Sequence, residues 1–375
     1  QVSRGTVVRS AYGINYTVGL YGSFAQDLAY QPPFAHVEVN LNLPPDLTLF
    51  PLRGGFGNSA DRGNYAISRN YRLPYTQVWY LEVQQALPHD IVLNVGYSGA
   101  KGTRLDVISA PGFYNNVPFA SAFFNFEDST AFSNFNALIV RANKRLLHGL
   151  ALQATYAYSH SIDDASSINA GAPVVAQNWQ DLRAEEGNSS FDIRHQVTGS
   201  FFYQLPFGRD KAYVSNSGWA SSLLSDWKVS GYFLCATGVP LTPLIAASAT
   251  EVERGTHGSV RPNRVPGVSI RAGGGHLHHW FNTAAFSTEF APGQLYGTAA
   301  RNSIPGPGID NLDLSLSRIV ALREGRTLEL RATANNTLNV VQYSGVNTQF
   351  DSSSNAQVDA FQPMRQITFL ARFQF

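Results

Sequence analysis

The sequence predicts an all-β protein, an antiparallel transmembrane β-barrel of which this chain supplies about ten strands. Three observations indicate this class. Short segments alternate apolar and polar residues with period two, the pattern of a strand with one apolar and one polar face. The connections between these segments are alternately short and long, as in outer-membrane barrels, where turns gather at one end and loops at the other. Charged residues make up only 14% of the chain, where about 25% is usual for a soluble protein.

The bulk composition excludes several other classes. A net charge of +1 and a pI near 8.0 give no indication of nucleic-acid binding. The single cysteine, Cys235, excludes an internal disulfide framework. The longest uncharged run, Val229 to Thr250, contains Pro240 and Pro243 and alternates in its first half, so we do not expect a membrane helix. Because Gln1 opens directly into strand-like sequence, we expect the chain to be a piece of a longer protein.

An opening strand is expected near Thr6 to Tyr16, and four hairpins follow it. In the first hairpin, "WYLEVQQ" alternates, and "LPHD" turns the chain into "IVLNVGY". The second joins residues 138–143 to 150–159 through "LLHG", and the third joins 196–205 to 227–235 through a longer connection containing "PFGRD". The fourth pairs 312–317 with 328–335, and the terminal "ITFLARFQF" supplies the last strand.

Long connections separate these hairpins, at residues 17–74, 101–133, 161–190, 239–308 and 339–364. All short turns then lie at the periplasmic end of the sheet, and all long loops lie at the extracellular end. Because backbone polar groups must be paired in lipid, we expect a closed barrel with its apolar face outward and its polar face toward the lumen. Aromatic girdles are expected at both interfaces, from Tyr97, Tyr156 and Tyr158 at loop ends and Trp227 and Phe375 at turn ends. A soluble sandwich or propeller would also alternate, but it explains neither the one-sided loop lengths nor the low charge.

A family resemblance is carried by several segments that arrive in a fixed order. They are "WYLEVQQALPHDIVLNVGYSGAKGTRL", "FNALIVRANKRLLHGLALQATYAYSHSIDD", "FDIRHQVTGSFFYQLPFG", "RPNRVPG", "WFNTAAF", "GTAARNSIPGPGIDNLDLSLSR" and the aromatic closing strand. Together they resemble the barrel of TonB-dependent transporters, specifically the Oar-like branch, over nearly the whole chain. The resemblance implies a plugged barrel of 22 strands. Residues 1–375 would then be its C-terminal part, with the plug, the TonB-contacting segment and an N-terminal carboxypeptidase-regulatory-like domain outside this sequence.

The resemblance also implies what such a protein does. It implies a non-enzymatic receptor without cofactor, which takes up a bulky ligand (a glycan, a peptide or a metal chelate) by TonB-driven transport after capture by the long loops. The location implied is the outer membrane of a Gram-negative cell. The implied partners are outer-membrane lipid, the protein's own plug, the TonB complex, the barrel assembly machinery and an extracellular ligand. Two alternatives stay open, a small outer-membrane barrel hydrolase and a surface adhesin.

Two histidine-containing segments are candidates for chemistry. "YSHSIDD" places His160, Asp163 and Asp164 at the extracellular lip, where a hydrolase would need a His–Asp pair within hydrogen-bond reach. "HLHHW" carries three imidazoles that could ligate a transition metal, namely His276, His278 and His279. For both segments the sequence favours ordinary polar loop residues, because no partner for catalysis is visible and the histidines sit in a glycine-rich stretch.

The remaining candidates are charged or terminal residues. An acidic cluster could hold Ca²⁺, but two interleaved arginines favour ion pairs; the cluster is Asp181, Glu185, Glu186 and Asp192, with Arg183 and Arg194. Four residues of the polar face are expected to contact the plug, namely Glu82, Arg141, Glu329 and Arg331. Phe375, with Phe373, is expected to anchor the closing strand at the periplasmic interface and to be read during barrel assembly.

Overall fold

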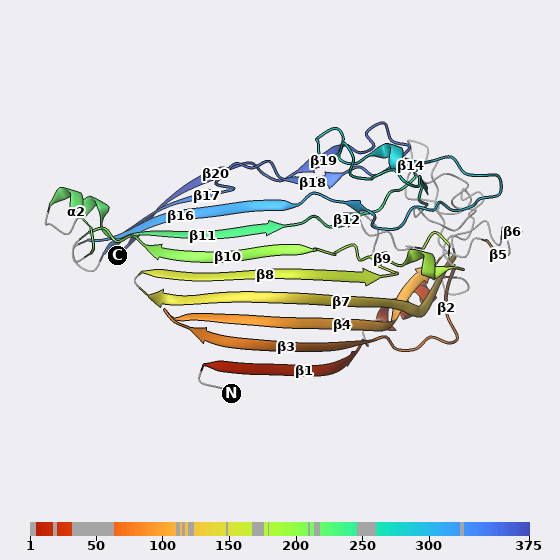
Figure 1. Cartoon of the computed structure of the whole chain (residues 1–375), viewed down its shortest axis with the longest axis horizontal. Coiled ribbons are helices and arrows are strands. Elements are labelled where there is room, and N and C mark those ends of the chain that lie inside the picture. The colour runs from red at the N-terminus through yellow and green to blue at the C-terminus, as the bar shows by residue number, and fades with distance from the viewer. Residues whose placement is uncertain are drawn as a thin grey trace, which may run out of the picture.

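The computed structural model describes residues 5–17, 21–31, 64–109, 113–114, 117–118, 124–147, 149–166, 176–178, 180–208, 211–213, 218–245, 260–322 and 326–375. Ten strands follow one another in chain order through a single antiparallel sheet (Figure 1). They are β1 (Thr6–Tyr16), β3 (Tyr75–Leu87), β4 (Ile91–Ser109), β7 (Phe124–Leu147), β8 (Leu150–Asp163), β10 (His195–Gln204), β11 (Trp227–Ala236), β16 (Ile309–Ala321), β17 (Thr327–Asn335) and β20 (Gln366–Gln374). The ten strands expected from the alternation are therefore confirmed.

Shorter elements lie beside this sheet or in its connections. β2 (Asn64–Ile67) runs parallel to the outer part of β7, and β9 (Gly187–Asn188) pairs with the end of β8. Four small pairs are β5 (Phe113–Tyr114) with β6 (Val117–Pro118), β12 (Pro240–Leu241) with β15 (Ile304–Pro305), β13 (Asn263–Arg264) with β14 (Phe286–Ser287), and β18 (Tyr343–Val346) with β19 (Val358–Phe361). The helices are α1 (Tyr21–Ala29), α2 (Trp219–Leu224) and the 3-10 turns Leu182–Glu185 and Thr283–Ala285. No helix in the described residues is long and apolar enough to span a membrane.

The hairpin turns gather at one end of the sheet, which we call the turn end. The β3–β4 turn uses His89 and Asp90 with φ of 64° and 56°, a left-handed conformation that Asp tolerates better than most residues. The β10–β11 connection is longer and contains α2. β1 begins and β20 finishes at this same end (Figure 1), so Phe375 lies where the alternation of turns and loops predicts.

The strand register separates an apolar from a polar face. One row of direct partners crosses five strands with only apolar and aromatic side chains: Val83, Val95, Val140, Tyr156 and Val197. The adjacent row is entirely polar: Gln84, Asn94, Arg141, Thr155 and Thr198. Directly paired residues project to the same side of a sheet, so the expected apolar and polar faces are confirmed across these strands.

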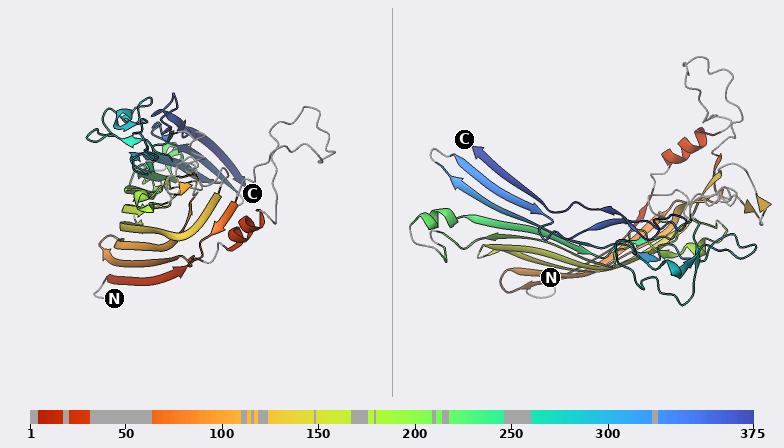
Figure 2. Two further views of the ribbon diagram at one scale, coloured as in Figure 1. Left: turned by 90° about the vertical axis from the view of Figure 1, so that its right-hand side faces the viewer. Right: turned by 90° about the horizontal axis from the view of Figure 1, so that it is seen from above.

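The sheet is a single curved layer whose apolar face is not covered by a second sheet (Figures 1 and 2). Large apolar side chains on it are exposed, among them Tyr12 at 63%, Leu81 at 50% and Phe369 at 80%. A β-sandwich would bury such residues between two layers. Within the described residues β1 pairs with β3 alone and β20 pairs with β17 alone, so the sheet is open at both edges.

Two strands are longer than the alternation predicts. β4 has 19 residues and β7 has 24, whereas about ten residues span a bilayer. Residues 101–109 and 126–133, expected within a loop, continue the ladder with shifts of register on either side of Leu105. These outer parts exceed the length that a spanning strand needs, so no lipid-facing side is required of them. Strict period-two alternation is therefore not required there, and these outer parts were not expected from the alternation.

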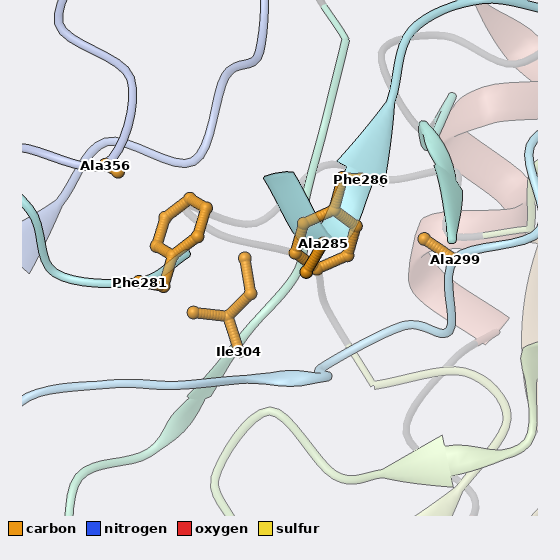
Figure 3. Close-up of a cluster of buried hydrophobic side chains, with 6 residues drawn as sticks. All are labelled: Phe281, Ala285, Phe286, Ala299, Ile304 and Ala356. Carbon is orange, nitrogen blue, oxygen red and sulfur yellow. The ribbon is translucent and has the colours of Figure 1, made fainter. Parts of the chain in front are cut away.

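A cluster of buried hydrophobic side chains lies in the loop-end connections (Figure 3). We call it the cap cluster, formed by Phe281, Ala285, Phe286, Ala299, Ile304 and Ala356. Its rings meet edge to face, with Phe281 and Phe286 centroids 6.2 Å apart. Phe350 packs against the cluster, so the described parts of two long connections, 239–308 and 339–364, form one packed module at the loop end.

Candidate functional site

Glu82 is the centre of an ion-pair group on the polar face. Arg9 Nη1 lies 3.4 Å from one carboxylate oxygen, and Arg141 Nη1 lies 3.7 Å from the other. Arg141 is on β7, so this second contact crosses β4, where Gly96 is the direct partner of Glu82 and carries no side chain. Arg9 also donates to Gln84 Oε1 at 2.7 Å. The group therefore joins β1, β3 and β7 through one half-buried carboxylate.

The other two predicted polar-face residues form a second ion pair. Arg331 Nη2 lies 2.5 Å from Glu329 Oε1, both on β17. The two residues border a hollow of about 470 Å³. Its other lining residues are mostly polar: Phe202, Lys228, Ser230, Ser315, Ser317, Ile319 and Thr333. The Arg331 and Glu329 side chains are 49% and 17% exposed, so they keep hydrogen-bonding capacity for a further polar surface, and an exposed pair of this kind contributes only about 0–1 kcal/mol to stability.

The loop end holds a buried ion pair between Arg261 and Glu185, which are 1% and 0% exposed. Arg261 Nη2 donates to Glu185 Oε1 at 2.9 Å, and Nη1 donates to the second oxygen. The backbone N–H of Gln177 donates to the same carboxylate at 3.2 Å. Ion pairing within the acidic cluster was expected, but the partner of Glu185 is Arg261 and not the exposed Arg183. Asp192 does pair with Arg194, at 3.2 Å.

Arg301 forms a second buried pair beside the first. Its Nη2 lies 2.6 Å from Asp163 Oδ1 and donates to the Asp163 carbonyl as well, while its Nε donates to the carbonyl of Glu185. Burial by itself raises the pKa of Asp163, but hydrogen bonds from Ser189 and Ser166 and the Arg301 charge outweigh it, and the pKa is lowered. Arg301 thus connects the end of β8 to the segment that carries Glu185.

The candidate lip site for hydrolysis is not assembled. His160 Nε2 contacts Asn188 Oδ1 at 3.1 Å, Asp163 pairs with Arg301, and Asp164 Oδ1 accepts from the backbone N–H of Phe132 at 2.8 Å. Burial raises the pKa of Asp164 to about 6. Each of the three side chains therefore has its own structural partner, and the described contacts form no His–Asp relay.

The three histidines of "HLHHW" lie on an exposed tight turn. His276 and His279 exchange backbone hydrogen bonds at 3.1 and 3.0 Å, and His279 Nδ1 contacts the carbonyl of His278. Within the part of the chain that the structure describes, no group of three or more His, Cys, Asp or Glu side chains is arranged to hold a metal ion.

The end of β20 carries the two terminal aromatic residues. Phe373 pairs with Leu328 in the ladder, and the Phe373 and Phe375 rings are stacked with centroids 6.1 Å apart. Phe375 is completely exposed. Toward the loop end of the apolar face, Tyr97, Leu138 and Tyr158 form one row of partners, so aromatic residues lie at both ends of that face. Membrane anchoring and a role in assembly stay predictions.

Three arginines of this arrangement were missed by sequence reasoning: Arg9, Arg261 and Arg301. The latter two occur in "RPNRVPG" and "GTAARNSIPGPG", which carried the resemblance, yet nothing in these short segments shows which arginine is buried. Their partners lie 76 and 138 residues away in the chain. Arg9 lies on a strand whose alternation is weak, because Ser10 interrupts its apolar side and Val7 and Ala11 lie on its polar side.

The sequence and the fold are similar to those of known outer-membrane proteins. Residues 1–368 match the family described as an outer membrane β-barrel domain. The outer-membrane transporter YddB from Escherichia coli superposes with a TM-score of 0.54 at 9% identity, over 98% of this chain and 38% of YddB. Lower similarity is found with P. aeruginosa FpvA bound to heterologous pyoverdines (TM-score 0.38, 10% identity, 80% of this chain and 27% of FpvA) and with the copper transporter OprC (0.35, 10%, 80% and 31%).

No curated protein matches the sequence. The chain spans 38% of the length of YddB, and at 9% identity that similarity shows the fold alone. The family match covers nearly the whole sequence, and it places the sheet in the outer membrane. The chain belongs to the outer-membrane β-barrel domain family.

Proposed function

We propose that the chain is part of the barrel of a TonB-dependent transporter, the receptor that takes up a bulky extracellular ligand. The observation that carries this proposal is an open sheet of ten sequential strands with one apolar face and one polar face, whose two edge strands have no further partner within the described residues. Unpaired strand edges are not stable in lipid. Further strands of a longer protein would complete the barrel, and the superposition on part of the YddB fold supports this.

The polar face supports a plugged lumen. Glu82, Arg9 and Arg141 have side chains 26%, 51% and 40% exposed, so their charges are open to a partner on the concave side. A plug with polar surface would complete their hydrogen bonds, and ordered water would bridge the remainder. Ligand capture falls to the loop end, where the cap cluster and the two buried ion pairs hold the long connections together.

The proposal is tested on the full-length protein in cells. A photo-crosslinking amino acid at Thr155, on the polar face, should form an intramolecular crosslink to the plug. The same amino acid at Ala154, its neighbour on the apolar face, should crosslink to lipid and not to the plug. Crosslinking of both positions to the plug, or of neither, would contradict a plugged barrel with these faces.

Transport is tested separately with stated probes. Cells producing the full-length protein receive radiolabelled ferric chelates, fluorescent oligosaccharides or fluorescent peptides, with TonB present or deleted. We expect accumulation of one probe class that is lost without TonB or after a protonophore. Accumulation that is independent of TonB would identify an ordinary diffusion pore and overturn the energised mechanism.

A further inference from the structure

A hollow of about 870 Å³ lies at the outer ends of β10 and β11, against the connection that holds residues 260–308. The strand side contributes Arg194, His195 and Thr237, and the connection contributes Arg264 and Arg271. The proposed transport function uses none of these residues.

The hollow carries a surplus of positive charge. Of its described lining residues three are arginines and one is a carboxylate, Asp192, which Arg194 pairs at 3.2 Å. Arg264 donates only to backbone carbonyls, including that of Ala285 at 2.8 Å, and its guanidinium lies 5.7 Å from the centre of the Phe286 ring. The exposed Arg271 side chain has no hydrogen-bond or ion-pair partner within the described residues. Neither Arg264 nor Arg271 pairs with a carboxylate within the described residues, and their positive charges favour an anionic ligand.

The strand-side wall of the hollow continues the apolar, lipid-facing side of the sheet. His195 is the direct ladder partner of Tyr158, and its Nδ1 lies 2.9 Å from the Tyr156 hydroxyl. Along β8 the apolar face carries Ala154 and then Tyr156 and Tyr158. The His195 imidazole and the basic hollow follow at its outer end. Figure 2 shows residues around 260–300 (cyan) on the side of the sheet opposite α1, which lies on the concave side.

This order matches the layers of an outer leaflet. Hydrocarbon meets small and apolar side chains, the interface meets tyrosine, and charged headgroups meet arginine. A soluble anion would not require continuity with the lipid-facing side, whereas a lipid headgroup does. A second hollow of about 200 Å³ adjoins the first, shares Arg271 and Ile270 with it, and is bordered by Trp280. An aromatic surface beside a guanidinium suits a sugar that bears a phosphate.

We propose that this hollow binds the phosphate-bearing sugar headgroup of an outer-leaflet glycolipid, with Arg271 as the principal phosphate contact. The acyl chains of the same lipid would rest on the apolar face below, along Tyr156 and Tyr158. Binding of this kind stabilises the loop-end module against the membrane surface. It does not depend on which ligand the protein transports or on whether it transports one.

The test uses the purified full-length protein in detergent and measures bound lipid by native mass spectrometry. The probes are lipid A with both phosphates, the same lipid with its phosphates removed, and inorganic phosphate alone. Arg271→Gln should lower the affinity for phosphorylated lipid A about fivefold, Arg271→Glu should lower it further, and Arg271→Lys should keep most of it. Arg183→Gln is the matched control, because Arg183 is an exposed arginine outside the hollow. Heat-modifiability of every variant verifies folding.

The expected result is loss in Arg271→Gln and Arg271→Glu, no change in Arg183→Gln, and weak binding of the dephosphorylated lipid. Equal affinities in wild type and Arg271→Glu would overturn the proposal. So would equal binding of phosphorylated and dephosphorylated lipid, or an equal loss in Arg183→Gln. Displacement of the lipid by millimolar inorganic phosphate would also overturn it, because the site would then bind a free anion and not a lipid.

Discussion

Replacing Arg261 with methionine tests whether the buried ion pair holds the loop-end module together. The change removes both hydrogen bonds to Glu185 while filling a similar volume, and Glu185 stays fully buried. A carboxylate left without its partner in a buried site costs about 3–5 kcal/mol. We therefore expect the segments around 176–189 and 260–308 to open more readily, while the sheet keeps its stability.

Two further variants separate charge from packing. In the double variant Arg261→Met with Glu185→Leu, no uncompensated charge remains, so most of the loss should be recovered. Recovery should be incomplete, because the Gln177 N–H then loses its acceptor and a buried unsatisfied donor costs about 1–3 kcal/mol. Arg183→Met is the control, since Arg183 is exposed and does not contact Glu185, and it should leave the module unchanged.

Hydrogen exchange of the full-length protein, followed by mass spectrometry, measures the effect. A loss of about 3–5 kcal/mol raises exchange rates in the two segments from roughly a hundredfold to several thousandfold, provided that exchange reports the opening equilibrium. Peptides from β16 and β17 provide the internal reference. Unchanged exchange in Arg261→Met would refute the argument, as would a double variant no better protected than the single one.

Three more predictions follow from the faces, the loop end and the terminus. Ala154→Arg should impair bilayer insertion by about 2–4 kcal/mol, whereas Gln153→Arg on the polar face should be tolerated; equal heat-modifiability of the two variants would contradict the face assignment. Because the pKa of Asp164 is raised to about 6, folding stability falls as pH rises from about 4 to 6, so Asp164→Asn should stabilise the loop end by up to about 3 kcal/mol at pH 7.5. This gain should vanish below pH 4, and protease resistance across pH measures it. Deletion of Phe375 should lower outer-membrane abundance and replacement by Trp should restore it, whereas normal abundance of Phe375→Asp would exclude the anchoring role.

The sheet could be predicted from the sequence because its physical cause is local. Lipid on one side and a polar environment on the other impose period two on every spanning strand, as the adjacent rows through Val140 and Arg141 show. The pairing of Glu82 with Arg141 was not foreseen, since it depends on the missing side chain of Gly96 on the strand between them. From the sequence, both residues were expected on the polar face, but no contact between them was expected.

The loop end could not be predicted to the same depth. Burial of Arg261 and Arg301 depends on partners contributed by connections far apart in the chain, and no local pattern marks a buried arginine. The outer parts of β4 and β7 were missed for a related reason. These parts exceed the length that a spanning strand needs, so the strands keep their hydrogen bonds without a requirement for strict alternation.

The position of the hydrophobic core follows from the same reasoning. A sheet that faces lipid on one side and a polar lumen on the other has no dry interior of its own, so it cannot supply a packed core. The cap cluster supplies one in the loops, where Phe281, Phe286 and Ile304 are almost fully buried. Water surrounds the loops, so burial of apolar area there gains the full hydrophobic contribution, which lipid-facing residues do not obtain. The wall is therefore held by its backbone ladder and the surrounding bilayer, and the loop end is held by a small core and two buried ion pairs. Because these two sources of stability are physically independent, the loop-end surface can change shape or composition without loss of the barrel wall beneath it.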